Sequence, residues 1–177
     1  MLTVLDYCLW EVLDNVLNHS DGSFVYGKGT GYVCSQYFPK HQQIRIMVAD
    51  TGVGIHKSLT THPNSEHKNL NEKEAIGLAI EKDITNSLGQ GFGLWATAEM
   101  IRKNEGKLIL HSGNHQLKYE KDVGIKYIPT WKGTFVFLKI NTNKPMSYNA
   151  IFGESSVQKD RFQEIKEELT EKLDDLW

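Results

Sequence analysis

Apolar residues near the start of the chain recur at intervals of three or four positions. At 100° per residue, the members of this set share one side of a helix: Leu5, Leu9, Val12, Leu13 and Val16. Glu11, Asn15 and Asn18 fall on the opposite side, and Glu11 and Asn15 are neighbours on successive turns. The pattern predicts a helix over residues 2–18. The carboxylate of Glu11 and the carboxamide of Asn15 could bind a metal-bound anion and a water molecule. The alternative is that both are ordinary solvated positions of an amphipathic helix.

Strand patterns follow this helix. Residues 32–38 are rich in aromatic and β-branched side chains and end at Pro39. Residues 44–50 place Ile44, Ile46 and Val48 at alternate positions, which predicts a second strand that ends at Asp50. Three later stretches are also predicted to be extended: residues 107–111, residues 113–131 as a strand pair or hairpin, and residues 133–140.

The rest of the chain predicts three further helices. Residues 56–70 are polar, but Asn71 can cap a short helix to about Lys82, with Glu74 completing a capping box. Residues 94–105 predict a helix closed by Gly106. Residues 156–176 predict a helix with one narrow apolar stripe, made of Phe162, Ile165, Leu169, Leu173 and Leu176. This last helix either docks on the domain or serves a partner.

Composition sets limits on these possibilities. A chain of 177 residues with 40% hydrophobic and 24% charged residues fits one domain, or one domain with an appendage. The net charge of −2 gives no electrostatic case for nucleic acid, and no apolar run is long enough for a membrane span. Cys8 and Cys34 form neither a disulfide framework nor a zinc set. Without a basic leader at its start, the chain is expected to be cytoplasmic.

Two glycine motifs carry candidate chemistry. Asp50-Thr-Gly-Val-Gly-Ile55 places a carboxylate at a strand end, where it can accept a hydrogen bond from an exocyclic amine beside a flat ring. Asp-Thr-Gly is also a common turn, so a structural role is the alternative. Gly89, Gly91 and Gly93 precede a helix, where backbone N–H groups can face a phosphate, although a hinge is the rival interpretation.

Two other phosphate motifs are excluded. Residues 22–28 nearly match a P-loop, but Gly29 stands where Ser or Thr should hold the metal. A dinucleotide-binding fingerprint would need a strand directly before the glycines, and the polar residues 83–88 do not supply one.

Three motifs therefore remain, in a fixed order: Glu11-x-x-Asp14-Asn15, Asp50-x-Gly52-x-Gly54-Ile55 and Gly89-x-Gly91-x-Gly93-Leu94. With this set the chain resembles the ATP-binding domain shared by gyrase, the heat-shock chaperone ATPases, sensor histidine kinases and mismatch-repair ATPases. The resemblance to this histidine-kinase-like superfamily covers roughly residues 2–140. It implies ATP and Mg²⁺ as cofactors.

The resemblance also implies roles for single residues. Asn15 would hold the magnesium ion, Asp50 would accept from the adenine amino group, and Glu11 would polarise an attacking water. The base pocket would be lined by Gly52, Gly54 and Ile55. The phosphates would be contacted by Gly89, Gly91, Gly93 and Leu94. Thr134, which follows Gly133 in a late Gly-Thr motif, would also contact the nucleotide. Residues 56–88 would form a mobile lid.

Some parts of that superfamily are absent. The sequence has no phosphoacceptor helix with a His followed by an acid and a later Pro, and no second domain to donate a catalytic lysine. The chain begins almost at the first motif, so an upstream domain or a protein partner is expected. His19-Ser20 after the first motif and the predicted helix at residues 75–80 favour the kinase-type branch.

The expected fold is α+β: a two-layer sandwich of the Bergerat type, with a mixed, mostly antiparallel sheet and helices on one face. Residues 1–145 would be the ATP-binding domain and residues 146–177 a connector and amphipathic helix. The expected function is Mg-dependent binding of ATP or ADP in a signalling or regulatory protein. It would act by phosphotransfer in trans or by slow hydrolysis. The alternative is a non-catalytic, nucleotide-gated interaction module.

Overall fold

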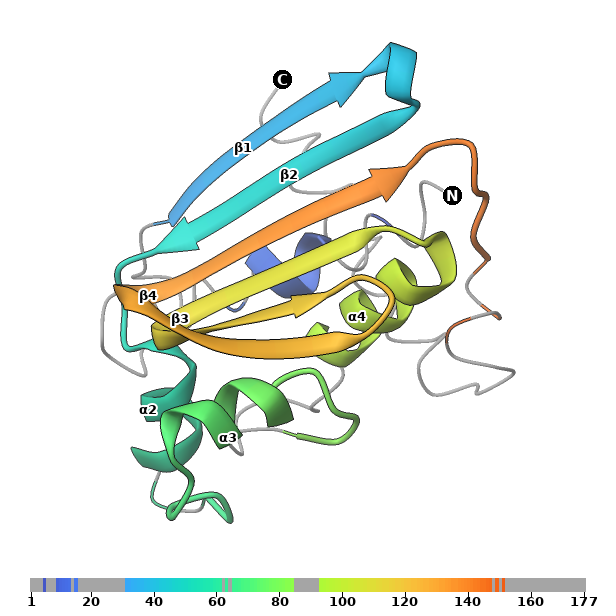
Figure 1. Ribbon diagram of the computed structural model, residues 1–177. Helices are drawn as coiled ribbons and strands as arrows, with labels where there is room; N and C mark the ends of the chain where they lie inside the picture. Colours follow the sequence, from blue (N-terminus) through green and yellow to red (C-terminus); the bar gives the residue numbers. More distant parts are fainter. Residues whose placement is uncertain are drawn as a thin grey trace, which may run out of the picture.

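The computed structural model describes residues 5, 9–13, 15, 31–61, 63, 65–84, 93–147, 149 and 151. Within them, four strands form one antiparallel sheet in the order β1-β2-β4-β3. The strands are β1 (Gly31–Phe38), β2 (Gln43–Asp50), β3 (Lys107–Tyr119) and β4 (Val123–Asn141). A short 3-10 helix, η1 (Pro39–His41), joins β1 to β2. The helices lie on one face of this sheet (Figure 1).

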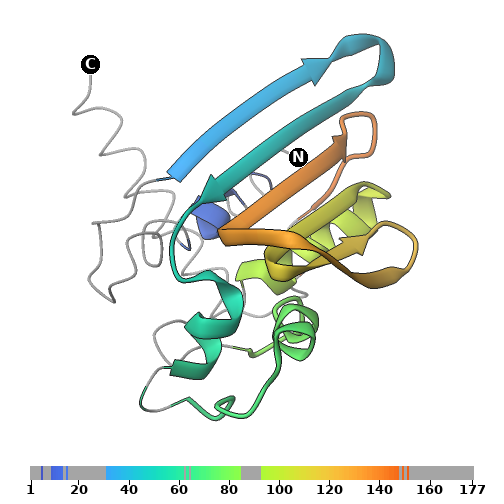
Figure 2. The same ribbon diagram turned by 60° about the vertical axis from the view of Figure 1, so that its left-hand side comes forward.

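Three of these helices have continuous bounds: α2 (Gly54–Thr61), α3 (Glu72–Leu78) and α4 (Gly93–Asn104). Leu5, residues 9–13 and Asn15 also have helical backbone, as the N-terminal pattern predicts. Figure 2 shows α2 and α3 at one end of the sheet, below the end of β2, while α4 runs behind β3 and β4. The expected α+β class, with a mostly antiparallel sheet and helices on one face, is confirmed.

The core lies between the sheet and the helices. Alternate residues of β2 and β4 point into it and are almost fully buried, as are the inward positions of β3 and one side of α4: Ile46, Val48, Val136, Leu138, Ile140, Leu108, Leu110, Ala96, Met100 and Ile101. Val12 of the N-terminal helical segment is 1% exposed and belongs to the same core. The described members of the predicted stripe, Leu5, Leu9, Val12 and Leu13, therefore belong to or pack against the core, as their spacing predicts, while Val16 lies outside the described residues.

The end of α4 differs from the prediction in one residue. Glu105, not Gly106, adopts the left-handed conformation, with φ 52°. The N–H of Gly106 donates to the carbonyl of Ile101 at 3.0 Å and that of Glu105 to the carbonyl of Arg102 at 3.3 Å, which is the Schellman pattern. Gly106 is needed for a different reason, because a Cβ there would lie 2.3 Å from the Lys139 carbonyl oxygen.

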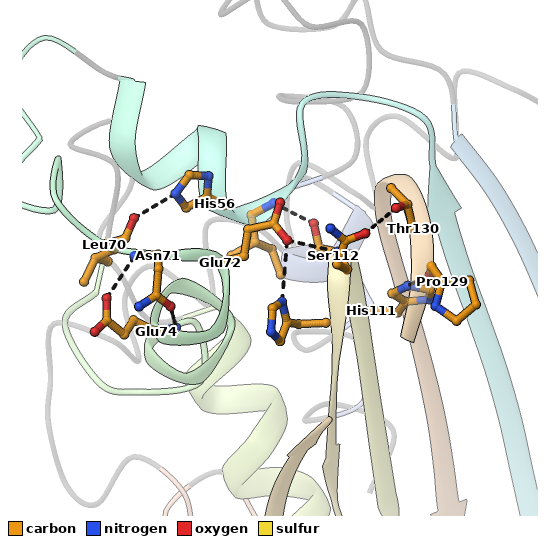
Figure 3. Close-up of polar contacts among 12 residues, drawn as sticks. His56, Leu70, Asn71, Glu72, Glu74, His111, Ser112, Pro129 and Thr130 are labelled. Carbon is orange, nitrogen blue, oxygen red and sulfur yellow. Dashed lines mark hydrogen bonds and ion pairs between the residues drawn. The ribbon is translucent and has the colours of Figure 1, made fainter. Parts of the chain in front are cut away.

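The segment between β2 and α4 is more helical than its sequence suggests. The predicted capping box is present, with Asn71 and Glu74 bonded reciprocally at 2.9 Å (Figure 3). However, α3 ends at Leu78 rather than near Lys82, and α2 occupies part of a stretch for which no helix was predicted. Its first residue is a glycine with φ +76° and only Ile55 and Leu59 give it a buried apolar side, so neither a cap nor a long stripe marks it.

Several predictions lie outside the described residues. They are the C-terminal helix at residues 156–176, the end of the expected lid at residues 85–88, and Gly89 and Gly91 of the third motif. Among the described helices, none combines the length and the apolar character that crossing a membrane requires.

Candidate functional site

Asp50 is a buried carboxylate at the end of β2. The exposed fraction of the whole residue is only 3%. Oδ1 accepts a hydrogen bond from the N–H of Gly52 at 2.7 Å and another from the N–H of Thr134, on β4, at 3.2 Å. Both bonds fall on the same oxygen, so they fix the plane of the carboxylate and direct Oδ2 away from these two donors. Burial raises the pKa of Asp50 above its ordinary value of 3.8, and the two backbone hydrogen bonds oppose that rise.

The adjoining part of β4 approaches the end of β2 unusually closely. Gly133 has φ +94°, and a Cβ at this position would lie 2.4 Å from the carbonyl oxygen of Asp50. Only glycine fits both the conformation and the space. The indole nitrogen of Trp131 donates to the same carbonyl oxygen at 3.1 Å. The late Gly-Thr pair therefore places Thr134 directly beside Asp50.

Ser112 joins the start of α2 to this arrangement. Its buried hydroxyl donates to the carbonyl of Gly133 at 2.8 Å and accepts from the N–H of Ile55 at 2.9 Å. A Cβ on Gly54 would lie 2.7 Å from the same hydroxyl oxygen. Three segments that are far apart in the sequence, residues 50–55, Ser112 and residues 133–134, are thus held together.

Ser112 was not among the predicted site residues. It occupies the inward position that Leu108 and Leu110 predict by alternation, and the sheet register shifts directly after it, between Ser112 and Gly113. A glycine inside a strand pattern is a signal for a bulge, and a polar residue at the inward position beside it indicates that this position serves a hydrogen bond rather than the apolar core.

Glu72, the first residue of α3, contacts β3 at the register shift after Ser112. One carboxylate oxygen of Glu72 accepts from the N–H of Asn114 at 3.1 Å and lies 3.5 Å from Nδ1 of His115. Gly113 leaves room for it, since a Cβ there would lie 2.9 Å from the carboxylate, and its φ is +58°. Figure 3 shows Glu72 between α3 and the strand that carries Ser112. Glu72 and His115 were not predicted, because their pairing depends on the register of β3.

The expected lid has one further contact within itself and one with α4. Nε2 of His56 on α2 lies 2.8 Å from the carbonyl oxygen of Leu70, just before α3 (Figure 3). The ammonium group of Lys82 lies 5.4 Å from the ring centroid of Trp95 on α4, which is a cation–π contact. The described part of residues 56–84 therefore has defined contacts with β3 and α4.

Glu11 and Asn15 have the relation that their spacing predicts. Nδ2 of Asn15 donates to the backbone carbonyl of Glu11 at 2.8 Å, and Asn15 is exposed while Glu11 is half-buried. With the amide nitrogen engaged within the helix, Oδ1 is the atom of Asn15 suited to a cation. Figure 1 shows residues 9–13 and α4 on the same face of the sheet.

The structure brings five of the eleven predicted site residues close together: Asp50, Gly52, Gly54, Ile55 and Thr134. Asp50 accepts from Gly52 and Thr134, and Ser112 accepts from Ile55 and donates to Gly133, the neighbour of Thr134. Gly54 lies against the Ser112 hydroxyl without a hydrogen bond to it. Asn15 is bonded to the backbone of Glu11 within the N-terminal helical segment, which is a separate part of the described structure. Gly93 is the first residue of α4, Leu94 is half-buried against the core, and Gly89 and Gly91 lie outside the described residues.

No protein-family model matches this sequence, and no curated protein matches it. A solved structure of the ATPase region of Saccharomyces cerevisiae topoisomerase II is similar at a TM-score of 0.43 and 14% identity. A second structure of that region, bound to ICRF-187 (dexrazoxane), is similar at a TM-score of 0.40 and 16% identity. Each match covers 84% of this chain and 42% of the other, so this chain spans less than half of their length. At this level of similarity the matches assign no family.

Proposed function

We propose that this chain is the Mg-dependent ATP-binding domain of a cytoplasmic signalling or regulatory protein of the histidine-kinase-like type, acting together with other domains or partners. The proposal rests on the sequence motifs and on one structural observation. Oδ1 of Asp50 is held by the N–H groups of Gly52 and Thr134, which leaves Oδ2 to accept a hydrogen bond from another donor.

The surroundings of Asp50 suit a purine base. An adenine amino group is a neutral donor that would gain a charge-assisted hydrogen bond from the carboxylate. Gly52 and Gly54 carry no side chain that would block a flat ring, and Thr134 brings a hydroxyl to the same strand end. Guanine would present two adjacent donors, N1–H and its C2 amine, that match both oxygens of a carboxylate, whereas the single amine of adenine matches the one oxygen, Oδ2, that the backbone donors leave.

The triphosphate and its cation would lie toward the helices. Glycine-rich residues 89–93 lead into the N-terminus of α4, a 12-residue helix whose free N–H groups and dipole favour phosphate oxygens. Mg²⁺ takes oxygen ligands, and the exposed carboxamide of Asn15 supplies one. When bound, the ion would neutralise phosphate charge and orient the terminal phosphate.

Glu11 is the proposed catalytic residue. A carboxylate one turn before Asn15 would accept a proton from an attacking water if the chain hydrolyses ATP. In phosphotransfer to a partner protein, positioning and charge neutralisation would supply most of the barrier lowering. A nucleotide-gated interaction module would bind ATP through the same residues with no turnover, and measuring ATP turnover with and without partner proteins separates these modes.

Replacing one atom of Asp50 tests ATP binding directly. Asp50→Asn keeps an oxygen for the N–H groups of Gly52 and Thr134 but presents an NH₂ group to the adenine amine. We expect ATP affinity, measured by calorimetry with Mg²⁺, to fall by a factor of about 10–100, which corresponds to about 1.5–3 kcal/mol.

Asp122→Asn is the matched control, because Asp122 is an exposed carboxylate in the turn between β3 and β4. It should bind ATP as the parent chain does. If Asp50→Asn keeps its circular dichroism spectrum and also binds ATP unchanged, the assignment of Asp50 to the base is wrong.

A further inference from the structure

The peptide unit between Gly133 and Thr134 is held at both ends by side chains that come from other strands. Its carbonyl oxygen accepts a hydrogen bond from the hydroxyl of Ser112, on β3, at 2.8 Å. Its N–H donates to Oδ1 of Asp50, at the end of β2, at 3.2 Å. Because a peptide unit is planar and rigid, a rotation that breaks one of these bonds also moves the other. Ser112 is therefore linked to the Asp50 carboxylate through a single peptide unit.

The hydroxyl of Ser112 also accepts a hydrogen bond, and this determines where its own proton points. The N–H of Ile55, in the first turn of α2, donates to Oγ of Ser112 at 2.9 Å. With that N–H against the oxygen, the hydroxyl proton is directed to the carbonyl of Gly133. Every donor in the series thus points the same way, from α2 through Ser112 and residues 133–134 to Asp50. Hydrogen bonds aligned in this way polarise one another.

The position of Ser112 is fixed by its surroundings. The residue is 6% exposed, and the register of β3 shifts directly after it, at Gly113, whose φ is +58°. The carboxylate of Glu72 fills the space beside Gly113 and accepts from the N–H of Asn114 at 3.1 Å (Figure 3). Ser112 is thus a fixed point against which the peptide unit of residues 133–134 is held.

This arrangement matters for the base because Asp50 uses one oxygen for the protein and keeps the other for a ligand. Oδ1 accepts from the N–H groups of Gly52 and Thr134, so the bond from Thr134 helps to set the direction of Oδ2. Hydrogen bonds weaken steeply when their angle departs from linear. Without the Thr134 bond, the carboxylate would keep only the donor from Gly52, two residues along its own loop, and would be free to turn about it.

We propose that Ser112 is a positioning residue that sets the preference for a base with a 6-amino group. Its hydroxyl holds the peptide unit of residues 133–134, and that peptide unit holds the Asp50 carboxylate in the orientation that accepts the amine. The proposal rests on the proposed ATP binding and adds to it the residue that makes the carboxylate selective. Ser112 acts through Asp50 and needs no contact with the nucleotide.

Purine riboside triphosphate, which is ATP without its 6-amino group, isolates this effect. Calorimetry with Mg²⁺ should show that the parent chain prefers ATP by a factor of about 10–100, the range expected for one charge-assisted hydrogen bond. In Ser112→Ala this preference should fall severalfold, because the amine contact is weakened while the phosphate contacts are retained. Ser35→Ala, at an exposed position of β1, is the matched control and should keep the parent preference.

The ratio of the two affinities separates positioning from general destabilisation. A partly unfolded variant binds both nucleotides less tightly by the same factor, so its preference for ATP would stay at the parent value. An unchanged preference in Ser112→Ala would overturn the role of Ser112 and leave ATP binding intact. Equal affinities in the parent chain would instead contradict the contact between Asp50 and the amine, and with it both proposals.

Amide hydrogen exchange without nucleotide tests the series of hydrogen bonds itself. In Ser112→Ala the N–H of Thr134 should exchange faster relative to that of Leu138, a fully buried residue of the same strand. Unchanged exchange at Thr134 would show that Ser112 does not hold this peptide unit and would overturn the proposal.

The parent chain alone decides the question if Ser112→Ala does not fold. At equal saturation, ATP should slow amide exchange at Thr134 more than purine riboside triphosphate does, because only ATP fixes the Asp50 carboxylate from its other side. Equal protection of Thr134 by the two nucleotides would contradict the role of Ser112.

Discussion

Gly133 on β4 lies against the backbone of Asp50 at the end of β2, and this approach leaves no space for a side chain. Gly133→Ala would place a methyl group 2.4 Å from the Asp50 carbonyl oxygen and force an L-residue to φ +94°. We expect a loss of about 2 kcal/mol or more in the free energy of unfolding, measured with urea. Gly124→Ala in the same strand is the control, because no atom lies within 4 Å of its Cβ position and it should change stability little.

Asp50 should also give the protein a measurable pH dependence. Its pKa is raised in the folded state by burial, so the folded chain holds this proton at pH values where the unfolded chain has released it. The free energy of unfolding of the parent chain should therefore fall, relative to Asp50→Asn, as pH rises from about 3.8 through the folded-state pKa. Urea unfolding of both proteins across that range would show the difference, and a difference that grows in the opposite direction would contradict the shift.

Among the elements, α3 offers the clearest test of a sequence signal. Its capping box satisfies two backbone groups at the helix N-terminus. Asn71→Ala should cost about 1 kcal/mol of stability, and Asn71→Asp should retain most of it. Asn143→Ala, at an exposed turn after β4, serves as the control in thermal unfolding. If Asn71→Ala is as stable as this control, the cap contributes nothing to the fold.

The sequence predicts the elements that carry strong local patterns. Alternation identifies β2 up to Asp50, the cap identifies the start of α3, and the glycines mark the start of α4. The local pattern does not predict α2, because only Ile55 and Leu59 mark its apolar side, while Ile55 and His56 bond to Ser112 and Leu70, which are distant in sequence. The sequence also does not predict that Glu105 adopts the left-handed conformation, because Gly106 beside it is the better local candidate for that conformation. Gly106 is needed instead because it lies too close to the Lys139 carbonyl oxygen for a side chain.

Some residues of the candidate site can likewise be predicted from local sequence and others cannot. Asp50, Gly52, Gly54 and Thr134 are predictable because each belongs to a short motif. Ser112, Glu72 and His115 are not, since the register shift at Gly113 decides which of them meet.

For the whole molecule, nucleotide binding should appear as a gain in stability. A ligand at 100 times its dissociation constant stabilises the state that binds it by about 2.7 kcal/mol, so ATP with Mg²⁺ should raise the melting temperature. Asn15→Ala should remove most of the difference between ATP with and without Mg²⁺, while Asn143→Ala should keep it. A difference that survives in Asn15→Ala would assign the ion to other residues.

The order β1-β2-β4-β3 places strands from the two ends of the described chain at the centre of the sheet. Residues 31–50 form one hairpin and residues 107–141 another, and they meet only along β2 and β4, from Gln43 opposite Asn141 to Ala49 opposite Phe135. The carboxylate of Asp50 comes from the first hairpin and the N–H of Thr134 that orients it comes from the second. Two polypeptides produced separately, divided in the helical insertion between the two hairpins, would each lack one partner of the hydrogen bond between Asp50 and Thr134. Their complementation would recreate it, so the domain contains a natural dividing point for a split reporter of association.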